Sequence, residues 1–125
     1  MFKRRANDET PQVDTLIGKG ASVQGDLEFS GGLHVDGRIN GNVRAAHAAA
    51  STLSVSEHGV IEGSVEATSV VVNGRVNGDI FGSERVMLGA KARVLGNVHY
   101  SVIEMALGAE ITGKLIPRNT AEAPS

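Results

Sequence analysis

Hydrophobic and polar residues alternate along most of this chain, and the alternation is organised in a short unit that occurs six times. The unit reads small–x–aliphatic–x–Gly–x–aliphatic, as in Gly37-Arg38-Ile39-Asn40-Gly41-Asn42-Val43. Neighbouring central glycines are 16, 22, 15, 18 and 17 residues apart, at Gly25, Gly41, Gly63, Gly78, Gly96 and Gly113. A repeat of this length is typical of a solenoid, in which each unit buries its apolar face only by stacking on its neighbours.

A second apolar strand is expected between successive units. A coil of about 17 to 18 residues accommodates three short strands and their corners. The pattern therefore predicts an all-β fold, a right-handed parallel β-helix of triangular cross-section with about six coils, over residues 16–116. The second strands are predicted at Leu33-His34-Val35, Leu53-Ser54-Val55, Val70-Val71-Val72, Val86-Met87-Leu88 and Ile103-Glu104-Met105.

A left-handed β-helix is the alternative architecture, because its hexapeptide repeat also gives coils of three strands. That repeat requires an aliphatic residue at every sixth position. Leu27, Leu33 and Ile39 follow the rule, but Asn73 and Gly82 stand where it requires aliphatic residues. The variable length of the coils, from 15 to 22 residues, favours the right-handed form.

Three segments depart from the repeat. Residues 1–15 and 117–125 are polar, contain proline and show neither period, so both are predicted to be disordered tails. The segment from Arg44 to Thr52 accounts for the 22-residue coil and is predicted to form a longer corner.

Composition limits the classes of function. The formal net charge of −2 gives no reason to expect a nucleic-acid partner, and the absence of cysteine excludes disulfides and thiolate metal sites. The chain has no apolar run long enough for a transmembrane helix and no apolar stretch near Met1 that resembles a secretion signal. A cytoplasmic protein is the expectation.

The sequence carries no recognisable catalytic or cofactor-binding motif. The chain contains no phosphate-binding glycine loop, so neither a nucleotide nor another cofactor is expected. Its four histidines have no metal-ligand spacing, so no metal site and no catalytic residue are predicted. The histidines are His34, His47, His58 and His99.

Two outward-facing features remain as minor candidates for binding. Arg75 and Arg93 occupy equivalent positions on adjacent coils, where they either bind an acidic partner or are ordinary exposed charge. A polar column is predicted to keep one face soluble, and it consists of Asp26, Asn42, Ser64, Asp79 and Asn97.

The ends of the predicted solenoid carry no capping segment. A β-solenoid without caps exposes unpaired backbone groups and the apolar cross-section of its core. Such ends are expected to pair with other subunits, so a polymerisation interface is predicted at Leu16, Ile17, Leu107, Ile111, Leu115 and Ile116.

The first five residues combine a bulky apolar side chain with three cations. Each cation contributes about 1 kcal/mol at an anionic bilayer, and burial of Phe2 adds at most ~3 kcal/mol. One such arm is a weak anchor, but a polymer multiplies it through avidity. A membrane-binding segment is predicted at Met1, Phe2, Lys3, Arg4 and Arg5.

The repeated V-x-G-x-[VIL] units, seen most clearly from Leu33 to Val43 and from Val71 to Gly78, resemble the bactofilins, a family of bacterial polymer-forming cytoskeletal proteins. The resemblance covers Leu16 to Ile116 and extends to the short arm and the proline-containing tail. It implies a right-handed triangular β-helix that polymerises end to end without nucleotide. It also implies a place on the cytoplasmic face of the inner membrane, where family members organise cell-wall enzymes, cell shape or polar structures.

Two other functions fit a β-solenoid. The first is a left-handed β-helical acyltransferase, which would need a projecting loop with a catalytic histidine; only the segment around His47 offers one. The second is a monomeric binding module, which would need capped ends. The sequence favours a non-enzymatic polymer scaffold over both.

Overall fold

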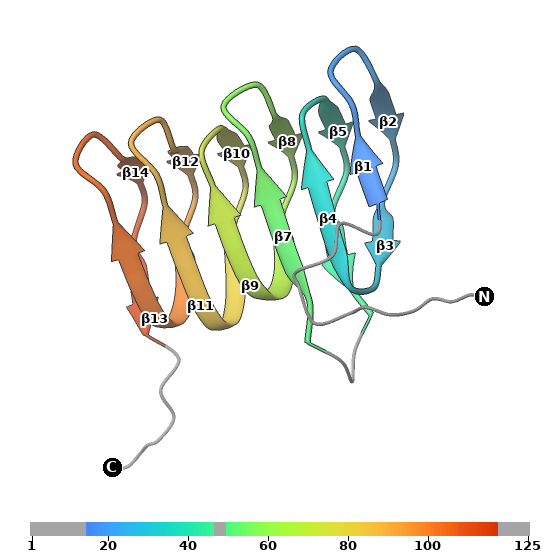
Figure 1. Ribbon diagram of the computed structural model, residues 1–125. Helices are drawn as coiled ribbons and strands as arrows, with labels where there is room; N and C mark the ends of the chain where they lie inside the picture. Colours follow the sequence, from blue (N-terminus) through green and yellow to red (C-terminus); the bar gives the residue numbers. More distant parts are fainter. Residues whose placement is uncertain (1–14, 47–49, 118–125) are drawn as a thin grey trace.

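The computed structural model describes residues 15–46 and 50–117, which form an all-strand parallel β-solenoid of about six turns (Figure 1). All strand pairs are parallel and join successive coils. Each coil contributes one strand segment to each of three sides. The predicted fold class is therefore confirmed.

Side 2 is the regular sheet of six strands. Its order from the N-terminal to the C-terminal end is β2 (Ser22–Gln24), β5 (Arg38–Asn40), β8 (Val60–Glu62), β10 (Arg75–Asn77), β12 (Arg93–Leu95) and β14 (Glu110–Thr112). The register of this sheet aligns Val23, Ile39, Ile61, Val76, Val94 and Ile111 in one column.

Sides 1 and 3 together form the nine-stranded sheet. Side 1 contains β1 (Thr15–Ile17), β4 (Gly32–Val35), β7 (Thr52–Val55) and the second halves of β9 (Val65–Val72), β11 (Ile80–Leu88) and β13 (Val98–Met105). Side 3 contains β3 (Leu27–Phe29), β6 (Val43–Ala45), the first halves of the same three long strands, and β15 (Leu115–Pro117).

The three long strands differ from the expected pattern of short strands separated by corners. In β11 the register shifts between Gly82 and Arg85, against both of its neighbours. Such an irregularity bends a strand without ending it. In the C-terminal half of the molecule, the chain therefore turns the corner between sides 3 and 1 without leaving the strand, in β9, β11 and β13. The remaining strands are three or four residues long.

The core is an aliphatic column inside the solenoid. Leu33, Ile39, Leu53, Ile61 and Ile80 are at most 1% exposed. Their β-branched or γ-branched side chains project inward because successive residues of a strand point to opposite faces. Full burial of each such side chain stabilises the fold by roughly 1.5–3 kcal/mol.

The repeated glycine is required by both its conformation and its neighbours. Gly41 and Gly63 have φ values of 156° and 155°, where side chains are strained. A Cβ atom at Gly63 would also collide with the carbonyl oxygen of Gly41 in the preceding coil. The glycine column thus lets adjacent coils stack at a corner, as its spacing in the sequence predicts.

The 22-residue coil accommodates its extra residues between β6 and β7. Residues 47–49 lie outside the described part of the chain. Beside them Ser51 is only 4% exposed, and its Oγ accepts a hydrogen bond from the backbone N–H of Thr68 at 3.1 Å. The segment leaves the strand after Ala45 and returns at Thr52, so the two strands extend further into it than the sequence predicts.

Candidate functional site

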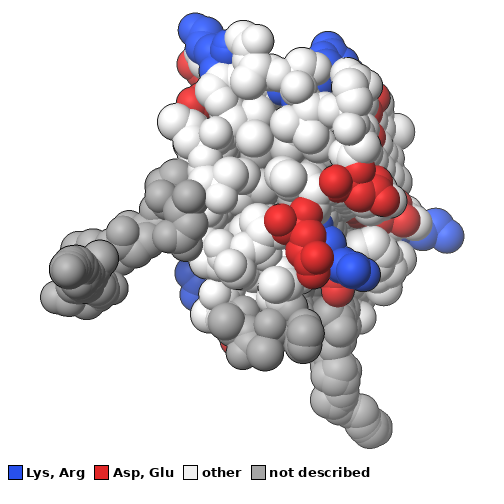
Figure 2. All heavy atoms as spheres, turned by 90° about the vertical axis from the view of Figure 1, so that its right-hand side faces the viewer, with Lys and Arg blue, Asp and Glu red and all other residues white. Residues whose placement is uncertain are grey.

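The two ends of the solenoid leave core columns without a covering coil. At the N-terminal end the inward-facing Ile17, Val23 and Leu27 are only partly buried. At the C-terminal end Met105 is 45% exposed and Leu115 is 44% exposed. Figure 2 shows the N-terminal end as a largely uncharged surface that carries one cluster of acidic and basic side chains near its middle and further charges at its margins.

Within the described residues, the strands at these ends have a neighbour on one side only. Strands β1, β2 and β3 each pair only with the second coil. At the opposite end β14 and β15 pair only with the fifth coil. Backbone N–H and C=O groups on such edges are free to pair with another chain. Each end therefore offers both an apolar surface and a hydrogen-bonding edge.

The six residues predicted for polymerisation fall into three groups. Ile17, Ile111 and Leu115 lie in the inward columns, and their side chains form part of the exposed core cross-section. Leu107 lies in the last corner and is 96% exposed. These four residues lie at the ends of the solenoid, and their part in polymerisation stays a prediction.

Leu16 and Ile116 lie elsewhere, on the lateral surface. Leu16 is 59% exposed and pairs in register with His34, in an outward-facing column of side 1. Ile116 pairs with His99, which follows Phe81 in an outward-facing column of side 3. The physical reason is the two-residue period of a strand, which sends adjacent residues to opposite faces.

The sequence interpretation missed four end residues, Val23, Leu27, Ile103 and Met105. Met105 continues the column of Val72 and Leu88, and Ile103 continues that of Val70 and Val86. Aligning the six repeats position by position is the signal that identifies them. The cross-section of the C-terminal end therefore includes Ile103, Met105, Ile111 and Leu115, with the smaller Ala109 beside them.

The polar column at the corner between sides 2 and 3 has a structural role beyond solubility. The Asp26 carboxylate accepts the backbone N–H of Asn42 at 2.9 Å, and the Asn42 side chain accepts that of Ser64 at 3.0 Å. Asp79 does the same for Asn97 at 2.9 Å. These bonds satisfy amides at a corner where no strand pairing does so. The recurring Gly-Asp and Gly-Asn pairs are the sequence signal for this ladder.

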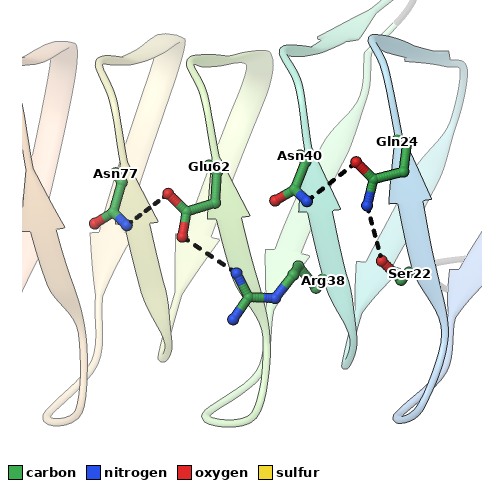
Figure 3. A network of polar contacts seen from close by, with 6 residues as sticks. All are labelled: Ser22, Gln24, Arg38, Asn40, Glu62 and Asn77. Atoms are coloured by element: carbon green, nitrogen blue, oxygen red, sulfur yellow. Dashed lines mark hydrogen bonds and ion pairs between the residues drawn. The ribbon is translucent and has the colours of Figure 1, made fainter.

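A second polar column runs along side 2 (Figure 3). Asn40 donates to Gln24 at 3.3 Å, and Asn77 donates to Glu62 at 2.9 Å. Glu62 also forms an exposed ion pair with Arg38 at 3.3 Å. Exposed contacts of this kind contribute little stability individually. They make the N-terminal two thirds of side 2 continuously polar.

The two arginines singled out in the sequence are register partners on adjacent strands, Arg75 in β10 and Arg93 in β12. Arg93 is engaged: it forms an ion pair with Glu110 at 3.6 Å and donates to the carbonyl of Gly108 at 2.9 Å. These contacts hold the Arg93 guanidinium against the last coil. A role of Arg75 and Arg93 in binding an acidic partner stays a prediction.

The corner between sides 1 and 2 holds a polar contact between coils. A hydrogen bond from Ser56 lowers the pKa of Asp36, and His34, whose Nε2 lies 3.3 Å from the carboxylate, lowers it further. Partial desolvation opposes these effects.

The described residues contain no group of three or more His, Asp or Glu side chains arranged to hold a metal ion. Within residues 15–46 and 50–117, no helix is long and apolar enough to cross a membrane. The predicted membrane-binding residues Met1 to Arg5, and His47, lie outside the described residues.

Comparison with known proteins identifies the architecture. A family model described as "Bactofilin: Polymer-forming cytoskeletal" matches residues 15–116. The chain belongs to the bactofilin family. The match spans all six coils, and its first residue is the first residue of β1.

Individual bactofilins support the assignment. Bactofilin BacO of Myxococcus xanthus is 30% identical over 114 residues, which cover 91% of this chain and 85% of BacO. Bactofilin BacP of the same organism is 28% identical over 102 residues, which cover 82% of this chain and 41% of BacP. The crystal structure of a mutant bactofilin from Thermus thermophilus matches with a TM-score of 0.66 and 30% identity, covering 74% of this chain and 98% of that one. The cytoskeletal family is thus favoured over the acyltransferase alternative.

Proposed function

We propose that this bactofilin assembles end to end into filaments without nucleotide, metal or other cofactor. The observation that carries the proposal is the pair of ends, which no other described residue covers; each combines an exposed core cross-section with strand edges unpaired within residues 15–46 and 50–117. Joining two ends would bury the apolar side chains and extend the strand pairing from one subunit into the next. A monomeric binding module would leave both features exposed to water.

We further propose that the filaments lie on the cytoplasmic face of the inner membrane and act as a scaffold for cell-shape or cell-wall machinery. The support is the cationic and apolar sequence from Met1 to Arg5 together with family membership. A single arm gives about 5–6 kcal/mol at most, which corresponds to roughly submillimolar affinity. Many arms on one filament would bind far more tightly.

Ile111→Arg tests end-to-end assembly. The substitution puts a charge into the C-terminal cross-section, where burying it unpaired costs several kcal/mol. Ile111 lies in the last coil, so we expect a folded protein that stops at monomers or dimers in analytical ultracentrifugation. Thr112→Arg is the matched control, because Thr112 is the next residue of β14 and its side chain is exposed. Long polymers of Ile111→Arg, or a monomeric wild type, would contradict the proposal.

Deletion of residues 2–10 tests membrane association. We expect the shortened protein to form filaments but to remain in the supernatant when anionic liposomes are sedimented, because its three arm cations and Phe2 are gone. Phe2→Arg should weaken sedimentation while keeping the positive charge. Unchanged sedimentation of the deletion variant would remove the arm from the model. Assembly of the wild type should continue in EDTA and without ATP or GTP.

A further inference from the structure

Side 3 carries a groove that begins beside the N-terminal end, with which it shares Leu27, and continues along the lateral surface away from that end. It has a volume of about 470 Å³ and runs along the solenoid axis over the first four coils. One margin of the groove is the polar column at the corner between sides 2 and 3, represented by Asp26, Asn42 and Ser64. The outward-facing residues of side 3 that line it are Glu28, Arg44, Glu66 and Phe81.

The groove has an excess of negative charge. It contains three carboxylates, on Asp26, Glu28 and Glu66, and one guanidinium, on Arg44. Glu28, Arg44 and Glu66 are successive partners in register, and all three are exposed. Among the ion pairs formed within the described part of the chain, none involves these three side chains. The two glutamates are therefore available to a cationic ligand.

The far end of the groove is aromatic. The ring of Phe81 is stacked on the imidazole of His99 with centroids 4.4 Å apart and an interplanar angle of 14°. Stacking restricts the ring, so Phe81 presents a fixed apolar edge to a ligand. The groove thus fits a segment that has several cations followed or preceded by one apolar anchor.

The arm of this chain has that composition, with Phe2 next to Lys3, Arg4 and Arg5. Its attachment point is close: Thr15 pairs with Leu33, just past the corner that leads from side 3 to β4. The ten residues from Arg5 to Thr15 span up to ~33 Å when extended. Four coils rise only about 14 Å from first to last. The arm is therefore long enough to reach every part of the groove.

We infer that this groove binds the arm of its own chain, with the arm cations beside Glu28, Glu66 and Asp26 and with Phe2 against Phe81. In this state the cations and the ring are withheld from lipid. Docking and membrane binding then compete for the same residues, and an anionic surface releases the arm. The competition rests on the proposed membrane association, whereas docking itself does not.

Disulfide trapping tests docking without any lipid. The chain has no cysteine, so two introduced cysteines report on one contact. Ala6→Cys leaves the first five residues intact, and Ser64→Cys places the partner in the groove. The matched control is Ala6→Cys with Ser22→Cys, since Ser22 is exposed on side 2 of the first coil. At low salt we expect the groove pair to close within one chain about tenfold faster than the control pair, reflecting a raised local concentration.

Charge removal supplies the second half of the test. Glu28→Gln with Glu66→Gln should slow groove trapping about fivefold, the effect expected for losing two exposed ion pairs. Equal closure rates for the groove and control pairs would overturn the inference. Disulfides formed only between chains would also overturn it, because the occupant would then be another subunit's arm.

The consequence for lipid is measured separately, on vesicles of equal parts phosphatidylglycerol and phosphatidylcholine. We expect the Glu28→Gln/Glu66→Gln variant to bind about fivefold more tightly than a variant with the same net charge, Glu84→Gln/Glu104→Gln. Glu84 and Glu104 are exposed and lie outside the groove. Equal binding by the two variants would overturn the competition. If wild type and arm-deleted protein bind the vesicles equally, the membrane proposal fails while the trapping result still decides docking.

Discussion

The middle and the terminal coils of the solenoid carry the same repeat but bury it to different extents. Ile61, in the third coil, is 0% exposed, whereas Ile111 occupies the same column in the last coil and is only partly buried. Leu88 is 2% exposed, and Met105, the next residue of its column, is 45% exposed. The side chains are similar, so the difference comes from the neighbouring coils.

A coil therefore does not bury its apolar side chains by itself. Part of the burial comes from the coils stacked on either side, as in other solenoids. Among the described residues a middle coil has a neighbour on both sides, whereas a terminal coil has only one. The same repeat therefore produces a fully buried core in the middle of the chain and a partly exposed core at its ends.

The glycine column gives the largest expected contrast between the two regions. At Gly63, alanine would suffer both a strained φ of 155° and a collision with the carbonyl of Gly41. At Gly25, in the first coil, φ is 111° but nothing lies within 4 Å of the added carbon. We expect Gly63→Ala to lower the free energy of unfolding by roughly 2–5 kcal/mol and Gly25→Ala by about 1 kcal/mol.

Urea unfolding followed by circular dichroism measures both changes. Both glycine substitutions are made in the Ile111→Arg protein, which is expected not to form filaments, so that differences in assembly do not affect the unfolding curves. Equal losses for the two glycines would show that φ alone matters and that the close approach of coils does not.

The sequence predicts the fold well because the glycine spacing is the coil length. The intervals of 16, 22, 15, 18 and 17 residues are also the register offsets from Val23 to Ile39 and onward along side 2. Only a stacked structure converts a distance along the chain directly into a neighbour in space.

The residues exposed at the two ends and in the groove of side 3 are harder to predict from the sequence than the fold is. Leu16 and Ile116 are aliphatic residues at the two ends, and composition alone gives no indication that they face outward. Their orientation follows from a one-residue difference in register, which reverses the face of a strand. The groove on side 3 also escapes prediction, because Glu28, Arg44, Glu66 and Phe81 are brought together only by stacking of four coils.

The outward-facing column of side 2 provides a second, smaller contrast. Its residue is polar in the fourth coil, Asn77, and apolar in the fifth coil, Leu95. Asn77 donates to Glu62, but its buried Oδ1 has no hydrogen-bond partner within the described residues. The reason is Leu95, the next residue of the column, which is 44% exposed and has no donor. We expect Leu95→Gln to raise the free energy of unfolding by about 0.5–1 kcal/mol by donating to that oxygen.

Leu95→Ala is the control for this substitution, since it removes the leucine without adding a donor. Both variants can be compared by urea unfolding in the Ile111→Arg background. A gain for alanine equal to that for glutamine would mean that relief of the exposed leucine, not the hydrogen bond, stabilises the fold.

The smallest expected effect concerns a corner that differs between middle and terminal coils. Ser56 and Asp36 form a contact between the third and second coils, whereas the equivalent corner position of the last coil is Ala106. The hydrogen bond from Ser56 favours ionised Asp36 and is the main reason that its pKa lies below the ordinary value of 3.8. A lowered pKa in the folded state stabilises the protein at pH values above that ordinary value, and the contribution is lost as the pH falls through the folded-state pKa.

Ser56→Ala should therefore raise the pKa of Asp36 toward 3.8, as measured by NMR titration of its carboxyl carbon. Ser22→Ala, in the first coil, is the control and should leave the pKa of Asp36 unchanged. An unchanged pKa in Ser56→Ala would assign the shift to His34 instead, and the contact between coils would have no part in it.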